Sequence, residues 1–250
     1  MSRRDDVNRL YKAPGILDRI ERVLFIIDVI AALVALSSDS TVVSVAIIIQ
    51  IVSAVFYFLS SIIDDGYFWY EAEKARRKNS VENGLGARLS ELETEEYYNN
   101  QSKVSLEKYA LNALESNMFS KEIAGKMILR SCIKSVVAIA VLVVAACRFL
   151  PDSEFLLIIA QTTFSSYVLI DTVQLVFYKL RMENLYKEGY TALITPGIKG
   201  KSRNAVLLAY AVEYEAIKAH YKIRLNEKIF KKNNDKLSEQ WNQVLSHKVK

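Results

Sequence analysis

Four long apolar stretches, separated by charged segments, dominate the hydrophobic pattern of this 250-residue chain. The cleanest runs from Thr41 to Ile63, which is 23 residues without a formal charge and apolar around the whole helical circumference. This length and composition predict a membrane-spanning helix. Three further apolar stretches are predicted to span the membrane: 23–36, 135–147 and 155–178.

The polar segments between these stretches predict how the helices are joined. Residues 37–40 and 148–154 are short, and the second segment contains Pro151 and Asp152, which favour a turn. Helices joined by such short loops are antiparallel neighbours. We therefore predict an all-α integral membrane protein with four transmembrane helices in two hairpins and with cytosolic helical segments. The alternative for the three less clean stretches is a soluble bundle of buried helices, which the lengths and spacings disfavour.

Basic residues set the predicted orientation. The first 22 residues hold six Lys or Arg, residues 64–127 hold nine and the tail from Lys179 holds fifteen, whereas the two short loops hold only Arg148. The positive-inside rule places the three basic segments in the cytoplasm. A cleaved signal peptide is the alternative for the first stretch, but a 22-residue leader and an aspartate within the stretch favour a retained helix. The predicted order is a cytosolic segment, a transmembrane hairpin, a cytosolic helical hairpin, a second transmembrane hairpin and a basic cytosolic helical region: 1–22, 23–63, 64–127, 128–180 and 181–250.

Charged and amide side chains inside the apolar stretches form the first candidate site. Asp28, Lys134 and Asp171 each lie about 9 to 10 Å inside the cytoplasmic end of their helix, at 1.5 Å per residue. Because a charge at the centre of a membrane helix costs about 2.5 to 3.5 kcal/mol, these side chains should face one another or a water-filled path. With Gln50, they are predicted to line or gate an ion path. A structural cluster that locks helix packing is the equal alternative.

A channel also sets a requirement on assembly. Four helices in one copy leave little room for an aqueous path, so the channel reading predicts a homo-oligomer of cyclic symmetry in the lipid bilayer, for example a tetramer.

The C-terminal region is the second candidate site, since residues 186–250 carry a net charge of +7. Positive charge attracts phosphates and tyrosine rings stack on bases, so this region is suited to anionic lipid, a nucleotide or an oligonucleotide. The positive-inside rule alone also explains such a tail. The candidate ligand-binding residues are Lys199, Lys201, Arg203, Lys218, Lys222 and Arg224. A stripe at spacings of three and four should pack against another helix: Leu207, Tyr210, Tyr214, Ile217 and Tyr221.

The sequence gives little support to an enzyme. Residues 195–202 resemble a phosphate-binding loop, but Thr195 stands where that loop has its first glycine. No nucleophile, base and orienting group appear together, and His220 and His247 have no partner at metal-ligand spacing. Cys132 and Cys147 lie about 22 Å apart on one predicted helix, too far to form a disulfide. We therefore expect no catalysis, no metal and no cofactor.

Three short segments and the four-span layout carry a resemblance: Arg9-Leu-Tyr-Lys12, Glu96-Tyr-Tyr-Asn-Asn100 and Glu115-Ser-Asn-Met-Phe-Ser120. The chain resembles the bacterial four-transmembrane pore-forming effectors that are encoded beside nucleotidyltransferases in anti-phage defence, especially the membrane effectors of the Hailong type. The resemblance implies an oligomeric channel in the bacterial inner membrane with both termini in the cytoplasm. It also implies gating by a nucleotide or oligonucleotide from the partner nucleotidyltransferase, and abortive infection as the outcome. The rival hypothesis is a non-channel membrane scaffold that recruits a cytosolic partner through residues 91–96 and 207–221.

Overall fold

The computed structural model describes residues 5–35, 37–94, 97–149, 155–194 and 201–248, without the side chains of 141–142, 145–149, 155–168 and 201. The regular secondary structure of these described residues is helical, without a strand, which confirms the all-α fold class. An isolated bridge joins Asp5 and Thr94. The elements are a 3-10 helix η1 (Asp6–Tyr11), α1 (Lys12–Val34), α2 (Ser40–Ile63), a π-helical turn η2 (Asp64–Phe68), α3 (Trp69–Leu85), α4 (Leu106–Phe149), α5 (Phe155–Leu193), α6 (Lys201–Tyr221) and α7 (Glu227–Lys248).

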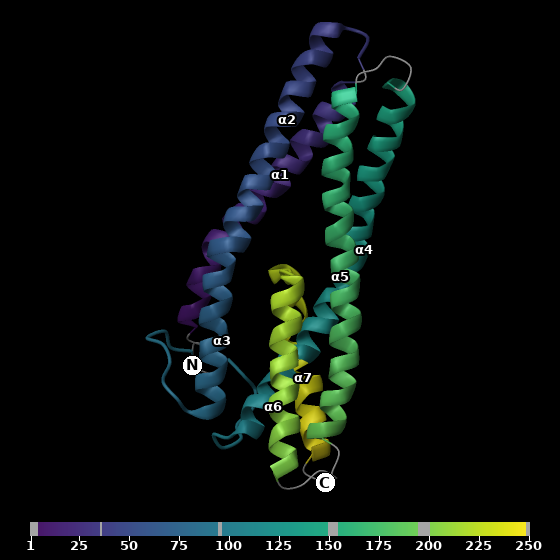
Figure 1. The fold of residues 1–250 in the computed structure, drawn as a ribbon. Helices are drawn as coiled ribbons and strands as arrows, with labels where there is room; N and C mark the ends of the chain where they lie inside the picture. The colour runs from purple at the N-terminus through teal and green to yellow at the C-terminus, as the bar shows by residue number, and fades with distance from the viewer. Residues whose placement is uncertain (1–4, 36, 95–96, 150–154, 195–200, 249–250) are drawn as a thin grey trace. The chain divides into compact units, whose positions relative to one another are not determined.

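A tight connection makes α1 and α2 neighbours, as the short polar segment predicts, and Figure 1 shows the two helices side by side. Asp39 ends the connection and caps α2, because its Oδ1 accepts hydrogen bonds from the backbone N of Thr41 at 2.8 Å and of Val42 at 3.3 Å. Such a cap satisfies backbone donors that have no partner in the first turn of a helix. The connection therefore fixes where α2 begins.

The helix that begins as α2 continues through η2 into α3 without a break, so it is apolar in its first half and charged in its second. It ends at Leu85, after which Gly86 adopts a φ of +72° that favours glycine. The backbone at Gly84 approaches α4 closely, because a Cβ there would lie 2.5 Å from the Cβ of Tyr109. Gly84, near the end of this helix, thus lets the backbones of α3 and α4 approach closely.

The chain divides into two compact units, each built from separate stretches of sequence. The hairpin unit comprises residues 10–71 and 129–173, and the core unit comprises residues 1–9, 72–128 and 174–250. Since α4 and α5 are each one continuous helix, both contribute to both units.

The core unit is packed around the stripe that the sequence predicts on α6. Four helix segments, from α4, α5, α6 and α7, contribute buried apolar side chains to one cluster, and Figure 1 shows α6 and α7 beside α5. Leu207 and Tyr214 of the stripe are 1 % and 4 % exposed, and the ring of Tyr221 lies 6.1 Å from that of Tyr178. The prediction that this stripe packs against another helix is confirmed.

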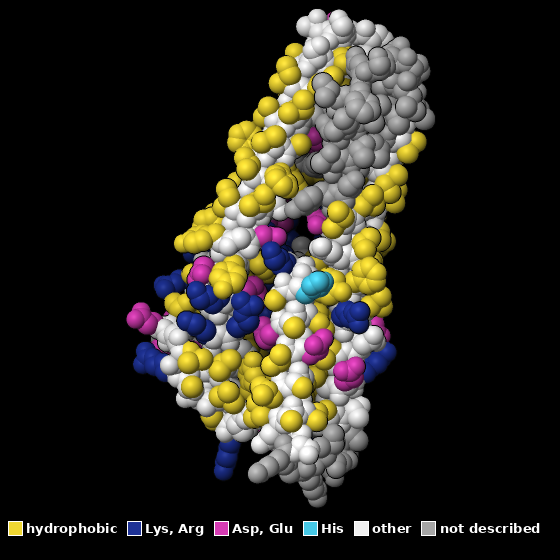
Figure 2. Space-filling model, viewed as in Figure 1, with side chains coloured by type: hydrophobic (Ala, Val, Ile, Leu, Met, Phe, Trp, Pro, Cys, Tyr) yellow, Lys and Arg dark blue, Asp and Glu magenta, His cyan; other side chains and the backbone are white. Residues whose placement is uncertain are grey.

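In the hairpin unit, α2 exposes apolar side chains and buries polar ones, whereas the core unit buries apolar side chains. Large apolar side chains on α2 are exposed, among them Ile48 at 61 % and Phe56 at 59 %, whereas Gln50 and Ser53 are buried. Figure 2 shows apolar side chains over the visible face of α1 and α2, while Lys, Arg, Asp and Glu gather over the core unit. A water-soluble helix normally buries its apolar face, so α2 is inverted with respect to water.

Among the described residues, one helix is long and apolar enough to cross a membrane, the continuous helix Ser40–Leu85. Only 22 % of its apolar window is buried inside the structure, which distinguishes it from the core helix of a soluble protein. In α1, Asp28 divides the apolar part of the helix into two short segments, 23–27 and 29–34. The two later predicted spans, 135–147 and 155–178, include residues 141–142, 145–147 and 155–168, whose side chains lie outside the description. Four spans therefore stay a prediction.

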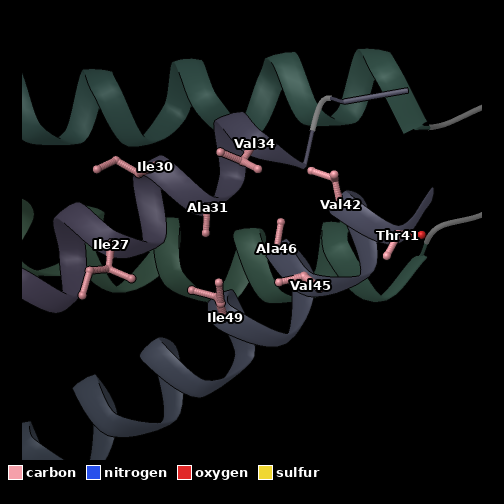
Figure 3. Close-up of a pocket in the computed structure, with 9 residues that line it drawn as sticks. All are labelled: Ile27, Ile30, Ala31, Val34, Thr41, Val42, Val45, Ala46 and Ile49. Carbon is pink, nitrogen blue, oxygen red and sulfur yellow. The ribbon is translucent and has the colours of Figure 1, made fainter. Parts of the chain in front are cut away.

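An open apolar groove of about 410 Å³ lies between α1 and α2 near their connection. Figure 3 shows the side chains that line it: Ile27, Ile30, Ala31 and Val34 from α1, and Thr41, Val42, Val45, Ala46 and Ile49 from α2. Apart from the hydroxyl of Thr41, these side chains are all aliphatic, so the groove is not suited to a nucleotide.

Candidate functional site

In the hairpin unit, Ser53 connects two of the predicted pore residues, Asp28 and Gln50. Ser53 itself was not among the predicted pore residues. Asp28 of α1 is 5 % exposed and Ser53 of α2 is 4 % exposed. The Oγ of Ser53 lies 3.3 Å from the Oδ1 of Asp28, to which it can donate a hydrogen bond, and 3.0 Å from the backbone oxygen of Gln50. Asp28, Ser53 and Gln50 thus form a buried polar cluster between two helices whose outer faces are apolar.

Gln50 is 1 % exposed, and neither its side-chain nitrogen nor its side-chain oxygen has a hydrogen-bond partner among the described residues. A buried polar group without a partner costs about 1 to 3 kcal/mol. The cluster therefore favours a further polar partner, such as water, an ion or another copy of the chain.

The first four buried positions of α2 lie three or four residues apart, and the buried positions become more polar along α2 and into η2. They are Val43, Ala46, Gln50, Ser53, Ser60, Ser61 and Asp64. Such spacing places them on one face. Ser53 could have been found from the sequence, since it stands three residues after Gln50 and therefore on the same face of the helix.

A second polar contact in the hairpin unit joins α4 and α5. The Oγ1 of Thr172 lies 2.6 Å from the Oγ of Ser131 and 2.7 Å from the Oγ of Ser135. The two other predicted pore residues, Lys134 and Asp171, are each next to one of these hydroxyls in sequence but have exposed side chains. The structure therefore buries Asp28 and Gln50 and leaves Lys134 and Asp171 at the surface of this unit.

The predicted ligand-binding residues in the core unit are partly used in internal ion pairs. Arg203 lies 3.0 Å from Glu107, which Lys248 also contacts, and Lys218 lies 2.9 Å from Glu73. Burial alone would raise the pKa of Glu107, but the hydrogen bonds and charges of Lys248 and Arg203 hold it below its usual range. These pairs connect α6 to α3 and α4, so Arg203 and Lys218 have a role in packing.

The candidate basic residues whose side chains the structure describes do not converge on one pocket. Lys199 and the side chain of Lys201 lie outside the described residues. Arg203 stands in the first turn of α6 and Lys222 follows its last residue, so their backbones are about 28 Å apart at 1.5 Å per residue. Lys222 is exposed, with a φ of 49°, and Arg224 is half-buried. Arg203 and Lys222 therefore cannot hold the same mononucleotide.

Two of the segments behind the family resemblance meet in the core unit. The carboxylate of Glu115 is 5 % exposed and accepts hydrogen bonds from the backbone N of Asn99 at 3.1 Å and from its Nδ2 at 2.7 Å. Asn100 donates to the Oδ1 of Asn112 at 3.2 Å, and Asn112 donates to the Oδ1 of Asn83 at 2.8 Å. These polar side chains hold the loop before α4 against α3 and α4.

Asn117 of the same segment lies where three helices meet. Its amide is within hydrogen-bond distance of the Tyr210 hydroxyl at 3.1 Å, the Met182 carbonyl oxygen at 2.9 Å and the Tyr186 backbone N at 3.1 Å. Asn117 is 0 % exposed. The sequence offered no chemistry for these residues, and the structure gives them a structural role.

Replacing Glu115 by Ala is expected to destabilise the core unit by about 2 kcal/mol, because hydrogen bonds to a charged group contribute about 1.5 to 3 kcal/mol. The measurement is the midpoint of thermal unfolding of the full chain in detergent. Glu239→Ala is the matched control, since Glu239 is exposed on α7. Equal midpoints for the two variants would show that the Glu115 contacts contribute nothing to stability.

No model of a known protein family matches this chain, and no curated protein or solved structure matches it significantly.

Proposed function

We propose that this chain is a subunit of an oligomeric ion channel or pore in a bacterial inner membrane, acting as an anti-phage defence effector. The observation that supports it most is the inverted hairpin, in which the apolar side chains of α2 are exposed and Asp28, Ser53 and Gln50 are buried. Hydrocarbon favours this distribution and water does not. The proposal includes four spans in two hairpins, with both termini in the cytoplasm.

The buried cluster is the part of the proposed pore that interacts with ions. A carboxylate, a hydroxyl and an amide can replace part of the hydration shell of a cation. The unpartnered Gln50 amide fits an assembly in which neighbouring copies or water supply the missing hydrogen bonds. One copy has little room for an aqueous path, so we propose that several copies form it.

The gating signal is proposed to be a nucleotide or oligonucleotide that binds the core unit from the cytosolic side. The net charge of +7 on residues 186–250 supports this, because positive charge attracts phosphates. The nucleotide chemistry of the ligand comes from the family resemblance.

The scaffold alternative has lost one of its two proposed docking surfaces. The Leu207 to Tyr221 stripe packs inside the core unit and is not exposed to a partner. Of the acidic run 91–96, residues 95–96 lie outside the described residues. We therefore favour the channel.

The test is cation flux from liposomes that contain the purified protein. We expect Asp28→Asn to lower potassium flux by about tenfold or more, because losing 1.4 kcal/mol of attraction for the ion corresponds to a factor of ten. Asp18→Asn is the control, since Asp18 lies on the same helix and forms a half-exposed ion pair with Arg22. Wild-type flux that is unchanged by Asp28→Asn and by Gln50→Leu would rule out a role of this cluster in conduction.

A further inference from the structure

The loop between α6 and α7 lies at the end of the core unit where α4 and α5 leave it. The ring of Tyr221, the last residue of α6, contacts the ring of Tyr178 on α5. The backbone N of Asn226, just before α7, donates to the Sδ of Met127 on α4 at 3.4 Å. Tyr178 ends the apolar stretch of α5, and Met127 precedes that of α4 by eight residues, about 12 Å. The loop is therefore beside the ends of two predicted spans.

The composition of this loop suits a membrane surface. Its sequence alternates basic and apolar residues, Lys222-Ile-Arg-Leu-Asn226. Ile223 and Leu225 pack against the core unit, while Lys222 is exposed. The apolar residues thus fix the loop, and the basic residues give it positive charge.

The first turns of α7 extend the same charge. Lys228, Lys232 and Lys236 are exposed and recur every four residues, which places them on one helical face. Asn233 accepts a hydrogen bond from Lys126 of α4, so this part of α7 also lies against α4. Residues 222–236 hold six Lys or Arg and two Asp or Glu. The surface is basic overall.

We propose that Lys222, Arg224, Lys228 and Lys232, the loop surface, bind anionic phospholipid headgroups at the membrane that α4 and α5 enter. The proposal rests on the membrane location proposed above and not on ion conduction. Lys228 and Lys232 are separate, exposed side chains along a helix, a spacing that fits a plane of headgroups better than a converging nucleotide pocket. Binding there would hold the core unit close to the membrane.

The test titrates the full-length protein, in an uncharged detergent, with fluorescent phosphatidylglycerol or phosphatidylcholine. The test variant replaces Lys222, Arg224, Lys228 and Lys232 by Gln. The control variant replaces four exposed basic residues elsewhere in the core unit by Gln: Lys78, Arg88, Lys103 and Lys187. We expect the test variant to weaken phosphatidylglycerol binding by about tenfold or more, since each basic residue near an anionic surface strengthens binding severalfold. The control should bind like the wild type.

Two outcomes would overturn the proposal. One is equal phosphatidylglycerol affinity of the test and control variants. The other is that binding of a short single-stranded oligonucleotide requires the four residues while binding of phosphatidylglycerol does not. That result would assign the surface to the gating ligand. If the test variant fails to fold, the double variant Lys228→Gln with Lys232→Gln replaces it, because both side chains are exposed on α7. Lipid binding is read without ion flux, so failure of this proposal is distinguishable from failure of the channel.

Discussion

Replacing Val52 by Lys is expected to reduce stable insertion of the α1–α2 hairpin into the membrane. Val52 lies near the middle of α2 and is 47 % exposed in the hairpin unit. If this face contacts lipid, a lysine there costs about 2.5 to 3.5 kcal/mol. If it contacts water, an exposed substitution of this kind changes stability by about 0.5 kcal/mol or less. The measurement is the fraction of protein that stays in the membrane after extraction at alkaline pH.

The control for this experiment is Val212→Lys on α6, a change of the same two residue types at a position that is 58 % exposed in the core unit. Insertion of the Val212 variant should equal that of the wild type. If Val52→Lys is also inserted like the wild type, then the exposed face of α2 is not a lipid-facing surface.

Replacing Trp241 by Ala is expected to destabilise the core unit by about 3 to 5 kcal/mol, the usual cost of removing a large aromatic side chain from a core. Trp241 of α7 is 0 % exposed and belongs to the cluster that α4, α5, α6 and α7 share. Its ring nitrogen has no hydrogen-bond partner among the described residues. Trp241→Phe should therefore cost much less, because it removes volume but breaks no hydrogen bond in this part of the chain.

The effect of Trp241→Ala is measured as a shift in the midpoint of thermal unfolding. A loss of this size lowers the midpoint of a domain of this length by about 10 °C. Leu208→Ala on α6 is the control, since Leu208 is 49 % exposed and should change the midpoint little. A Trp241→Ala midpoint within 2 °C of the Leu208→Ala midpoint would contradict the packing described for α7.

The elements with a strong local pattern could be predicted from the sequence. The charge-free run from Thr41 to Ile63 predicted α2 almost to the residue, and the spacing of Leu207 and Tyr214 predicted which face of α6 is buried. In each case the information lies within one helix, where hydrophobic periodicity and capping are decided by neighbours in sequence.

Contacts between distant helices could not be predicted in the same way. The sequence grouped Asp28, Gln50, Lys134 and Asp171 by depth, but burial also depends on how each helix is rotated about its axis. That rotation buries Asp28 against Ser53 and leaves Lys134 exposed. Likewise, the partners of Arg203 and Lys218 lie about 100 and 145 residues away, at Glu107 and Glu73. No spacing along one helix reports such pairs.

The most direct test of the channel proposal is the electrical current across a planar bilayer that contains the purified wild-type protein, with and without short single-stranded oligonucleotides. The proposal predicts discrete current steps whose frequency the oligonucleotide raises or abolishes. A bilayer that stays silent in every condition, with protein shown to be inserted, would contradict the channel and favour the scaffold.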